Sequence, residues 1–153
     1  MWPFKKKQKS VGMTTKESLT RFGIVPADEH LPVIRDLLAQ EAAAERAGRM
    51  REDELALLCC VQLFGRGLLE DVLLIWNAKR SGMDLASVID IEFLFGAGVE
   101  ETKRFLAGLS GALSGGGPDS VAAQALRDIE SYVSGGFSPA EHLEVYKKYF
   151  RVA

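Results

Sequence analysis

Two similar stretches of sequence decide the fold: residues 63–70 are LFGRGLLE and residues 94–101 are LFGAGVEE. Both contain Leu-Phe, two glycines separated by one residue, an aliphatic residue and a glutamate, and the second begins 31 residues after the first. A fixed period between about 20 and 50 residues is typical of stacked helical units. The two stretches therefore predict two similar helical units packed side by side.

Each stretch lies at a turn between two apolar segments that have helical spacing. Glycine ends a helix readily because it adopts the left-handed conformation without a steric cost. Gly65 and Gly82 are therefore expected to end the two helices of the first unit, and Asp84 to cap the first helix of the second unit. The predicted helices are 55–64, 68–80, 84–95 and 99–109.

One segment of the second unit, residues 87–95, has a conflicting local pattern. Asp90 and Glu92 alternate with large apolar residues, and a period of two is typical of a strand. The equivalent residues of the first unit, 58–62, do not alternate. We expect a helix because two copies of one unit should fold in the same way, and a strand is the alternative.

Two helices are predicted before the repeat. Thr14 and Glu17 have the spacing of a capping box, which begins a helix that Gly23 ends. A second helix is expected from near Pro32, since proline is favoured in a first turn, to Gly48. Its apolar stripe consists of Ile34, Leu37, Leu38 and Ala42. Glu41 and Glu45 are expected on the opposite side, facing solvent.

Two further helices are predicted after the repeat. Residues 110–117 are rich in glycine and serine and should form a flexible linker. A helix then begins at Pro118 or Asp119 and ends at Gly135-Gly136. The cap, the first-turn proline and the capping-box acid of the last helix are Ser138, Pro139 and Glu141.

The complete pattern predicts an all-α fold, a short α-solenoid-like array of stacked antiparallel helical hairpins with about eight helices. We expect a single domain over residues 14–153 and a disordered basic tail before it, residues 1–13. Trp76 is expected in the core because of its helical spacing from apolar neighbours, and a contact at an interface is the alternative. The predicted hairpins are 52–82, 84–109 and 118–150.

Residues 65–72, GRGLLEDV, are followed by Trp76 and by residues 79–82, KRSG. They resemble the inter-helix turn, the second-helix packing positions and the exit glycine of the tetratricopeptide and pentatricopeptide superfamily, over roughly residues 52–109. HEAT-like stacking fits equally well, since the tetratricopeptide Trp-x-x-Leu-Gly pattern is absent. The resemblance implies that the chain binds another macromolecule and does no chemistry; in the pentatricopeptide branch that macromolecule is RNA.

The charge is distributed unevenly along the chain. Five lysines precede the first acidic residue: Lys5, Lys6, Lys7, Lys9 and Lys16. Residues 17–153 keep 14 of the 19 basic residues and all 21 acidic ones, so their net charge is −7. An acidic body repels the phosphate backbone of nucleic acids and attracts basic proteins. We therefore expect a basic protein partner rather than a nucleic acid.

The N-terminal tail combines aromatic residues with lysines. Trp2, Pro3 and Phe4 beside the lysines could contact an anionic membrane surface, and a disordered tail in solution is the interpretation that we favour. No apolar run approaches the ~18 residues of a membrane span, and no apolar segment of a secretory signal follows the lysines. We expect a cytoplasmic protein.

Two glycine pairs have part of the pattern of a nucleotide-binding loop. Gly65-x-Gly67 and Gly96-x-Gly98 each open a helix, but neither has the third glycine or the preceding strand of a dinucleotide site. Tight hairpin turns explain both pairs. No cofactor site is therefore expected.

The cysteines and histidines do not have the spacing of a metal or catalytic site. Cys59 and Cys60 are adjacent, so on a helix their side chains point about 100° apart and cannot converge on one ion. We expect two buried, inert thiols. His30 and His142 have no histidine or cysteine at ligand spacing. The sequence predicts no metal, no catalytic residue and no enzymatic activity.

The candidate partner-binding residues are acidic. Asp90 and Glu92 lie in the middle of a predicted first helix, and first helices usually line the concave face of stacked hairpins; a solvated stripe is the alternative. Glu100 and Glu101 are further candidates, although their place in the first turn of a helix, where the dipole favours carboxylates, is a sufficient structural explanation. We predict a non-enzymatic protein–protein interaction module. Its general resemblance is to a bacterial immunity protein that binds and neutralises a toxin; an adaptor or assembly factor and an RNA-binding helical-repeat protein are alternatives.

Overall fold

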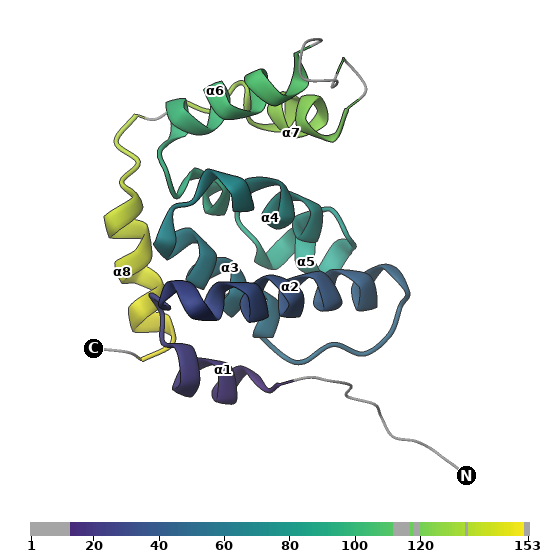
Figure 1. Ribbon diagram of the computed structural model, residues 1–153, viewed down its shortest axis with the longest axis vertical. Coiled ribbons are helices and arrows are strands. Elements are labelled where there is room, and N and C mark those ends of the chain that lie inside the picture. Colours follow the sequence, from purple (N-terminus) through teal and green to yellow (C-terminus); the bar gives the residue numbers. More distant parts are fainter. Residues whose placement is uncertain (1–12, 112–116, 118–119, 134, 152–153) are drawn as a thin grey trace.

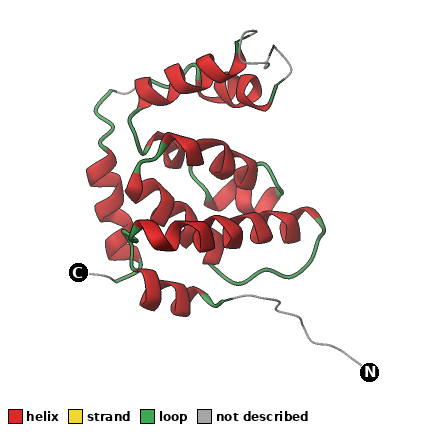
Figure 2. Cartoon of the chain, in the orientation of Figure 1, coloured by secondary structure: helices red, strands yellow, loops and turns green. Residues whose placement is uncertain are grey.

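The computed structural model of this chain describes residues 13–111, 117, 120–133 and 135–151, and every regular element in these ranges is a helix (Figures 1 and 2). The all-α fold class is therefore confirmed. The α-helices are α1 (Thr15–Phe22), α2 (Leu31–Arg46), α3 (Leu55–Arg66), α4 (Val72–Lys79), α5 (Met83–Val88), α6 (Val99–Ser110), α7 (Val121–Ile129) and α8 (Pro139–Tyr149). The 3-10 helices are η1 (Asp28–His30), η2 (Leu69–Asp71) and η3 (Ile91–Phe95).

The helices are stacked roughly in chain order, from α1 at the bottom of Figure 1 to α6 and α7 at the top. Helix α2 packs along both α3 and α4, and α4 in turn contacts α5, η3 and α7. Helices α6 and α7 pack against each other. Helix α8 (yellow) returns along one edge of the stack and packs against α3. The two helices of the predicted hairpin 118–150 therefore pack against different parts of the chain: α7 packs against α6, and α8 packs against α3.

Local capping signals place the helix starts correctly. The Thr14 hydroxyl accepts a hydrogen bond from the Glu17 amide (3.0 Å), and the Glu17 carboxylate accepts one from the Thr14 amide (2.7 Å). Ser138 caps α8 by accepting a hydrogen bond from the Glu141 amide (3.2 Å). The capping box of α1 and the cap of α8 are both confirmed.

Residues 84–95 do not form the single helix that the repeat predicts, and they do not form a strand. Helix α5 ends at Val88, and Ile89 and Asp90 are extended before η3 begins. Gly82, rather than Asp84, is the capping residue of α5. The Lys79 ammonium donates hydrogen bonds to two carbonyls at the end of α5, which satisfies groups that a continuous helix would have paired internally.

Other boundaries differ from the predicted ones by a few residues. Helix α3 continues through Gly65, and Gly67, in the left-handed conformation (φ 63°), ends it. Helix α7 begins after its capping residue Ser120 and ends at Ile129, well before the glycine pair. The predicted start at Pro118 or Asp119, like residues 1–12 of the predicted tail, lies outside the described residues.

Two glycines allow the turn of the first unit to approach the turn of the second closely. A Cβ atom at Gly67 would lie 2.9 Å from the Gly96 carbonyl oxygen, and a Cβ at Gly96 would lie 2.7 Å from the Phe64 carbonyl oxygen. Only glycine allows the two backbones to approach this closely. The turn of the first unit therefore packs directly against the turn of the second.

The core confirms one sequence prediction and corrects another. Trp76 is 6% exposed and lies in the core cluster, and its indole N–H donates a hydrogen bond to Asp128 (2.7 Å), which joins α4 to α7. Glu41 was predicted to face solvent, but it is only 8% exposed. Its carboxylate accepts hydrogen bonds from the Arg51 guanidinium (3.5 Å) and the Glu52 amide (3.4 Å), so it anchors the loop that follows α2.

None of the described helices has both the length and the apolarity that crossing a bilayer requires.

Candidate functional site

Two of the four predicted partner-binding acids face the C-terminal segment of the chain. The Asp90 carboxylate accepts a hydrogen bond from the Tyr146 hydroxyl (3.0 Å), and the Glu92 carboxylate accepts one from the Tyr132 hydroxyl (3.0 Å). The two acids also lie close enough to His142 to act on its charge. The structure therefore brings Asp90 and Glu92 together, in contacts within the chain.

A third pair of the same kind extends this row. The Tyr149 hydroxyl donates a hydrogen bond to the Glu54 carboxylate at the start of α3. We call the pairs Tyr132–Glu92, Tyr146–Asp90 and Tyr149–Glu54 the tyrosine seam. The seam attaches α8 and the segment before it to the body, and α8 itself contains no fully buried residue. These hydrogen bonds raise the pKa values of the three tyrosines, together with burial, which dominates for Tyr132 and Tyr146.

The other two predicted acids are not part of this cluster. Glu100 and Glu101 lie in the first turn of α6 and pair with Lys103 (4.0 Å) and Arg104 (2.5 Å) of the same helix. Such exposed pairs three residues apart stabilise a helix by only a few tenths of a kcal/mol. A role for these four acids in partner binding remains a prediction.

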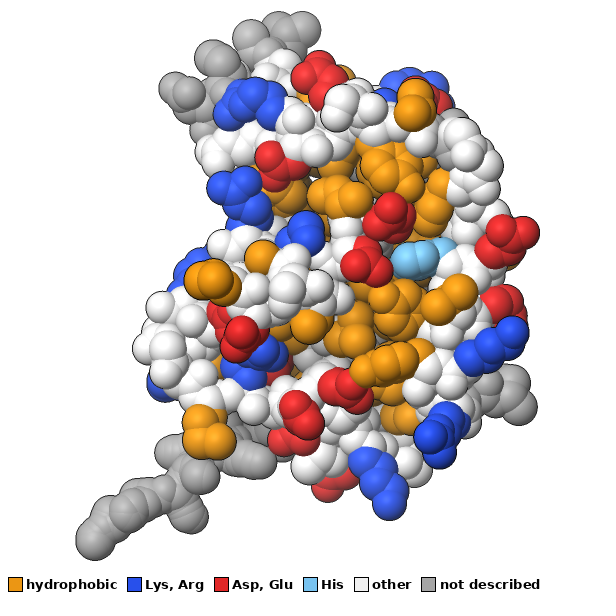
Figure 3. All heavy atoms as spheres, turned by 180° about the vertical axis from the view of Figure 1, so that it is seen from behind, with side chains coloured by type: hydrophobic (Ala, Val, Ile, Leu, Met, Phe, Trp, Pro, Cys, Tyr) orange, Lys and Arg blue, Asp and Glu red, His pale blue; other side chains and the backbone are white. Residues whose placement is uncertain are grey.

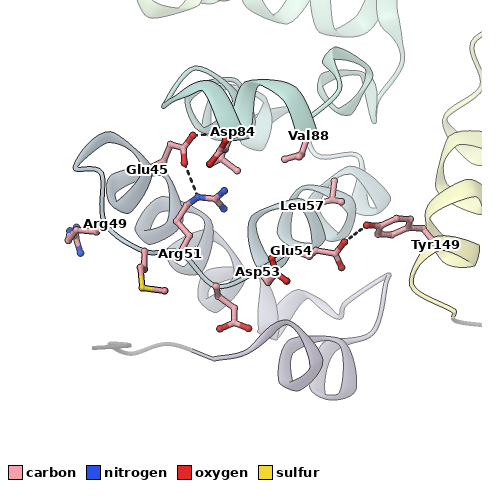
Figure 4. Close-up of a pocket in the computed structure, with 12 residues that line it drawn as sticks. Glu45, Arg49, Arg51, Asp53, Glu54, Leu57, Asp84, Val88 and Tyr149 are labelled. Carbon is pink, nitrogen blue, oxygen red and sulfur yellow. Dashed lines mark hydrogen bonds and ion pairs between the residues drawn. The ribbon is translucent and has the colours of Figure 1, made fainter. Parts of the chain in front are cut away.

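A pocket of about 490 Å³ lies between the loop 47–54, helix α5 and the end of α8 (Figure 4). Ligand sites in proteins typically have volumes of about 300–1,000 Å³, so this one is within the usual range. Its apolar lining comes from α3 and α5, through Leu57, Leu85 and Val88, and Tyr149 of the seam closes one side. We call it the acidic pocket because five acidic residues and two arginines line it.

Met50, in the lining of the acidic pocket, and Met83, one residue before the lining residue Asp84, are unusually exposed. Met50 is 90% exposed, and Met83, the first residue of α5, is 88% exposed. Large apolar side chains in such positions often mark interaction surfaces, and methionine adapts its shape to different partners. Figure 3 shows acidic and hydrophobic side chains interspersed over one face of the molecule.

One wall of the acidic pocket is held by Glu45. Its carboxylate accepts hydrogen bonds from the Leu85 amide (3.0 Å) and the Arg51 guanidinium (2.9 Å), and these bonds lower the pKa of Glu45 (Figure 4). The glutamate approaches so closely that a Cβ atom at Gly82 would lie 2.5 Å from it. Glu45 was predicted to face solvent; instead it joins α2, the loop 47–54 and α5.

The pocket could not be predicted from the sequence, because its lining residues come from distant segments of the chain. Residues 52–54, EDE, form an acidic run at the start of a predicted helix, and the helix dipole is sufficient to explain it. Asp84 lies 30 residues further along the chain, and Tyr149 is nearly a hundred residues from the loop.

The cysteines and histidines lie as the sequence predicts or in apolar surroundings. Cys59 and Cys60 are buried free thiols, and burial raises the pKa of each. His30 packs against Phe22, and His142 lies in a cluster of aromatic rings with its Nε2 atom buried. Within the described ranges, no three His, Cys, Asp or Glu residues are arranged to hold a metal ion.

Comparisons with protein-family models, curated proteins and solved structures found no match to this chain.

Proposed function

We propose that this chain is a non-enzymatic protein–protein interaction module that binds a basic protein. The observation that carries the proposal is Met50, 90% exposed among the acidic side chains that line the pocket, together with Met83, which is 88% exposed and precedes the lining residue Asp84. Protein interfaces combine an apolar, adaptable centre with polar surroundings, and methionine is enriched in them. The surface around the pocket has this composition.

The charge of the body supports a basic partner. Residues 17–153 carry a net charge of −7. An acidic protein attracts a basic one over distances comparable to the Debye length, about 8–10 Å at physiological salt, and this raises the association rate. The same charge opposes binding to RNA, whose affinity for proteins depends on cations near its phosphates.

Within this function, we propose that the chain is a bacterial immunity protein that covers and neutralises a basic toxin. The small size and the acidic, all-helical body suit this role, and a protein that masks another needs only a complementary surface. An adaptor or assembly factor would use the same surface without inhibiting its partner.

The experiment that tests the proposal begins with copurification of the full chain and its partner from the native cell. The purified partner is then bound to the purified chain by surface plasmon resonance at 50 mM and 300 mM salt. We expect a partner with a pI above that of this chain, and an association rate that falls as salt increases.

Two results would contradict the proposal. The first is the absence of any purified protein that binds the chain with a Kd below about 10 μM, roughly −7 kcal/mol. The second is tight binding of RNA at physiological salt by the chain lacking residues 1–16, seen in a gel-shift assay, because the remaining body is acidic. An inhibition assay on the partner separates an immunity protein from an adaptor.

A further inference from the structure

We infer that the acidic pocket is the docking site for a segment of the protein partner that carries a lysine or arginine next to an apolar residue. This inference rests on the proposed function and names the surface and the chemistry of recognition. Its basis is the combination of apolar contacts, two acids that form no ion pair within the described residues, and walls held by hydrogen bonds.

Two acidic residues line the pocket from separate segments of the chain. Asp53 comes from the loop 47–54, and Asp84 comes from α5 on another side of the pocket (Figure 4). Both residues are exposed, and within the described part of the chain neither carboxylate forms an ion pair. By contrast, Glu45 is bound to Arg51 (2.9 Å). The pocket therefore retains negative charge that a cationic side chain would neutralise.

Apolar residues also line the acidic pocket. Leu57 and Leu85 are buried, and Val88 is exposed on the same lining. A lysine or arginine can lay its apolar stem along such a surface while its charged end reaches a carboxylate. Because the chain already covers Leu57 and Leu85, Val88 (43% exposed) and Tyr149 (51% exposed) offer the apolar contact, which suits a long cationic side chain better than a short anion or a free metal ion.

Met50, in the pocket lining, and Met83, which precedes the lining residue Asp84, have flexible, polarisable and highly exposed side chains. They would cover an apolar residue beside the basic one in the partner, since methionine packs against surfaces of varied shape. These side chains thus favour a segment of a protein over an isolated cation.

Hydrogen bonds within the chain hold the walls of the acidic pocket in place before a ligand binds. The Glu45 carboxylate fixes α5 relative to the loop, and the Tyr149–Glu54 hydrogen bond fixes the side formed by α8. Arg51 also contacts Glu41, so the loop is anchored at a second point. A site whose walls are already in place loses less conformational entropy when a ligand binds.

The test uses the full chain with methionine methyl groups labelled with ¹³C and a ten-residue peptide of alternating arginine and leucine as the probe. A peptide of alternating glutamate and leucine is the charge control. At 50 mM salt, we expect the arginine peptide to shift the methyl signals of Met50 and Met83 and to leave that of Met13, which packs against the core, unchanged. The glutamate peptide should shift none of them.

Two double variants identify the acids responsible. We expect Asp53→Lys/Asp84→Lys to weaken the arginine peptide about tenfold or more, because two attractions become repulsions. The matched control, Glu100→Lys/Glu101→Lys on α6, reverses the same number of charges and should change the Kd less than twofold. If the first variant does not fold, as judged by circular dichroism, Asp53→Asn/Asp84→Asn replaces it.

The possible outcomes separate this inference from the proposed function. Arginine peptide that binds without shifting Met50 and Met83, or binds Asp53→Lys/Asp84→Lys as tightly as wild type, would overturn the pocket while a protein partner could still bind elsewhere. Failure of the arginine peptide to bind at 50 mM salt would also overturn the pocket. Failure of the partner experiment above would overturn the proposed function, whatever the peptide does.

Discussion

Replacement of Trp76 by alanine should be among the most destabilising single changes in this chain. Trp76 lies on α4 and is only 6% exposed in the core of the molecule. Its indole N–H donates a hydrogen bond to Asp128 on α7 (2.7 Å), and the Arg80 guanidinium lies 5.2 Å from the centroid of the ring. Truncating a buried tryptophan to alanine typically costs about 3–5 kcal/mol. A domain of this size has roughly 5–15 kcal/mol of total stability, so the loss would be a large share of it.

A conservative variant divides this loss into packing and hydrogen bonding. Trp76→Phe keeps most of the apolar contact but removes the donor to Asp128, and we expect it to cost about 1–3 kcal/mol, the range for a bond to a charged group. Asp128→Ala should cost a similar amount because it leaves the buried indole N–H without an acceptor. Trp76→Ala should be clearly worse than either.

The assay is urea unfolding at neutral pH, followed by far-UV circular dichroism so that the signal does not depend on the tryptophan itself. A loss below about 1 kcal/mol for Trp76→Ala would refute the reasoning, because a side chain that is buried in this way should leave a cavity. Equal losses for the alanine and phenylalanine variants would show that the hydrogen bond, and not packing, dominates.

Three further predictions follow from the turns, the aromatic cluster and the thiols. Gly96→Ala should cost about 1–3 kcal/mol in urea unfolding because its Cβ meets the Phe64 carbonyl at 2.7 Å, whereas Gly108→Ala, in open space on α6, should stabilise the chain by up to about 1 kcal/mol. Burial lowers the pKa of His142 below its usual 6.5, against the opposing effect of Asp90 and Glu92, so the unfolded chain binds the proton more readily. The free energy of unfolding should therefore fall as pH drops below about 6.5, and the fall should be smaller in His142→Phe. Cys59 and Cys60, buried with raised pKa values, should react with a thiol reagent only after urea unfolding, and fast reaction of the native protein would contradict this.

Local signals in the sequence predicted the helices well because their causes are local. The Thr14–Glu17 capping box and the Ser138 cap involve atoms only three residues apart, so a short stretch of sequence contains the whole interaction. Three of the four glycines of the repeat lie in turns as predicted, whereas Gly65 lies inside α3 and Gly67 ends that helix. Gly67 of the first copy and the non-equivalent Gly96 of the second are in close contact, so this contact explains why glycine stands at these two positions but not the 31-residue period.

The errors in the fold arose where distant residues decide the local structure. The predicted helix 84–95 is interrupted at Ile89, where Lys79 of the preceding helix binds the free carbonyls. Glu41 and Glu45 were expected in solvent from the pattern of α2 alone, but Arg51 draws both toward the loop. A helical wheel has no information about a cation that arrives from another segment.

The candidate site was predicted only in its general character. An acidic surface for a basic partner follows from the charge count, which needs no structure. The particular acids do not: Asp90 and Glu92 accept hydrogen bonds from tyrosines of the C-terminal segment, and the acidic pocket is formed by Asp53 and Asp84 from separate segments. The return of α8 to α3, which brings these tyrosines into place, has no local signal.

The association rate of the purified partner with three forms of the full chain tests the central claim most directly. The forms are wild type, Asp53→Lys/Asp84→Lys in the acidic pocket, and Asp90→Lys/Glu92→Lys in the tyrosine seam, each measured by surface plasmon resonance at two salt concentrations. The account predicts that the pocket variant associates about tenfold more slowly than wild type at low salt, that the difference shrinks at high salt, and that the pocket variant is slower than the seam variant. Equal association rates for all three forms would contradict it.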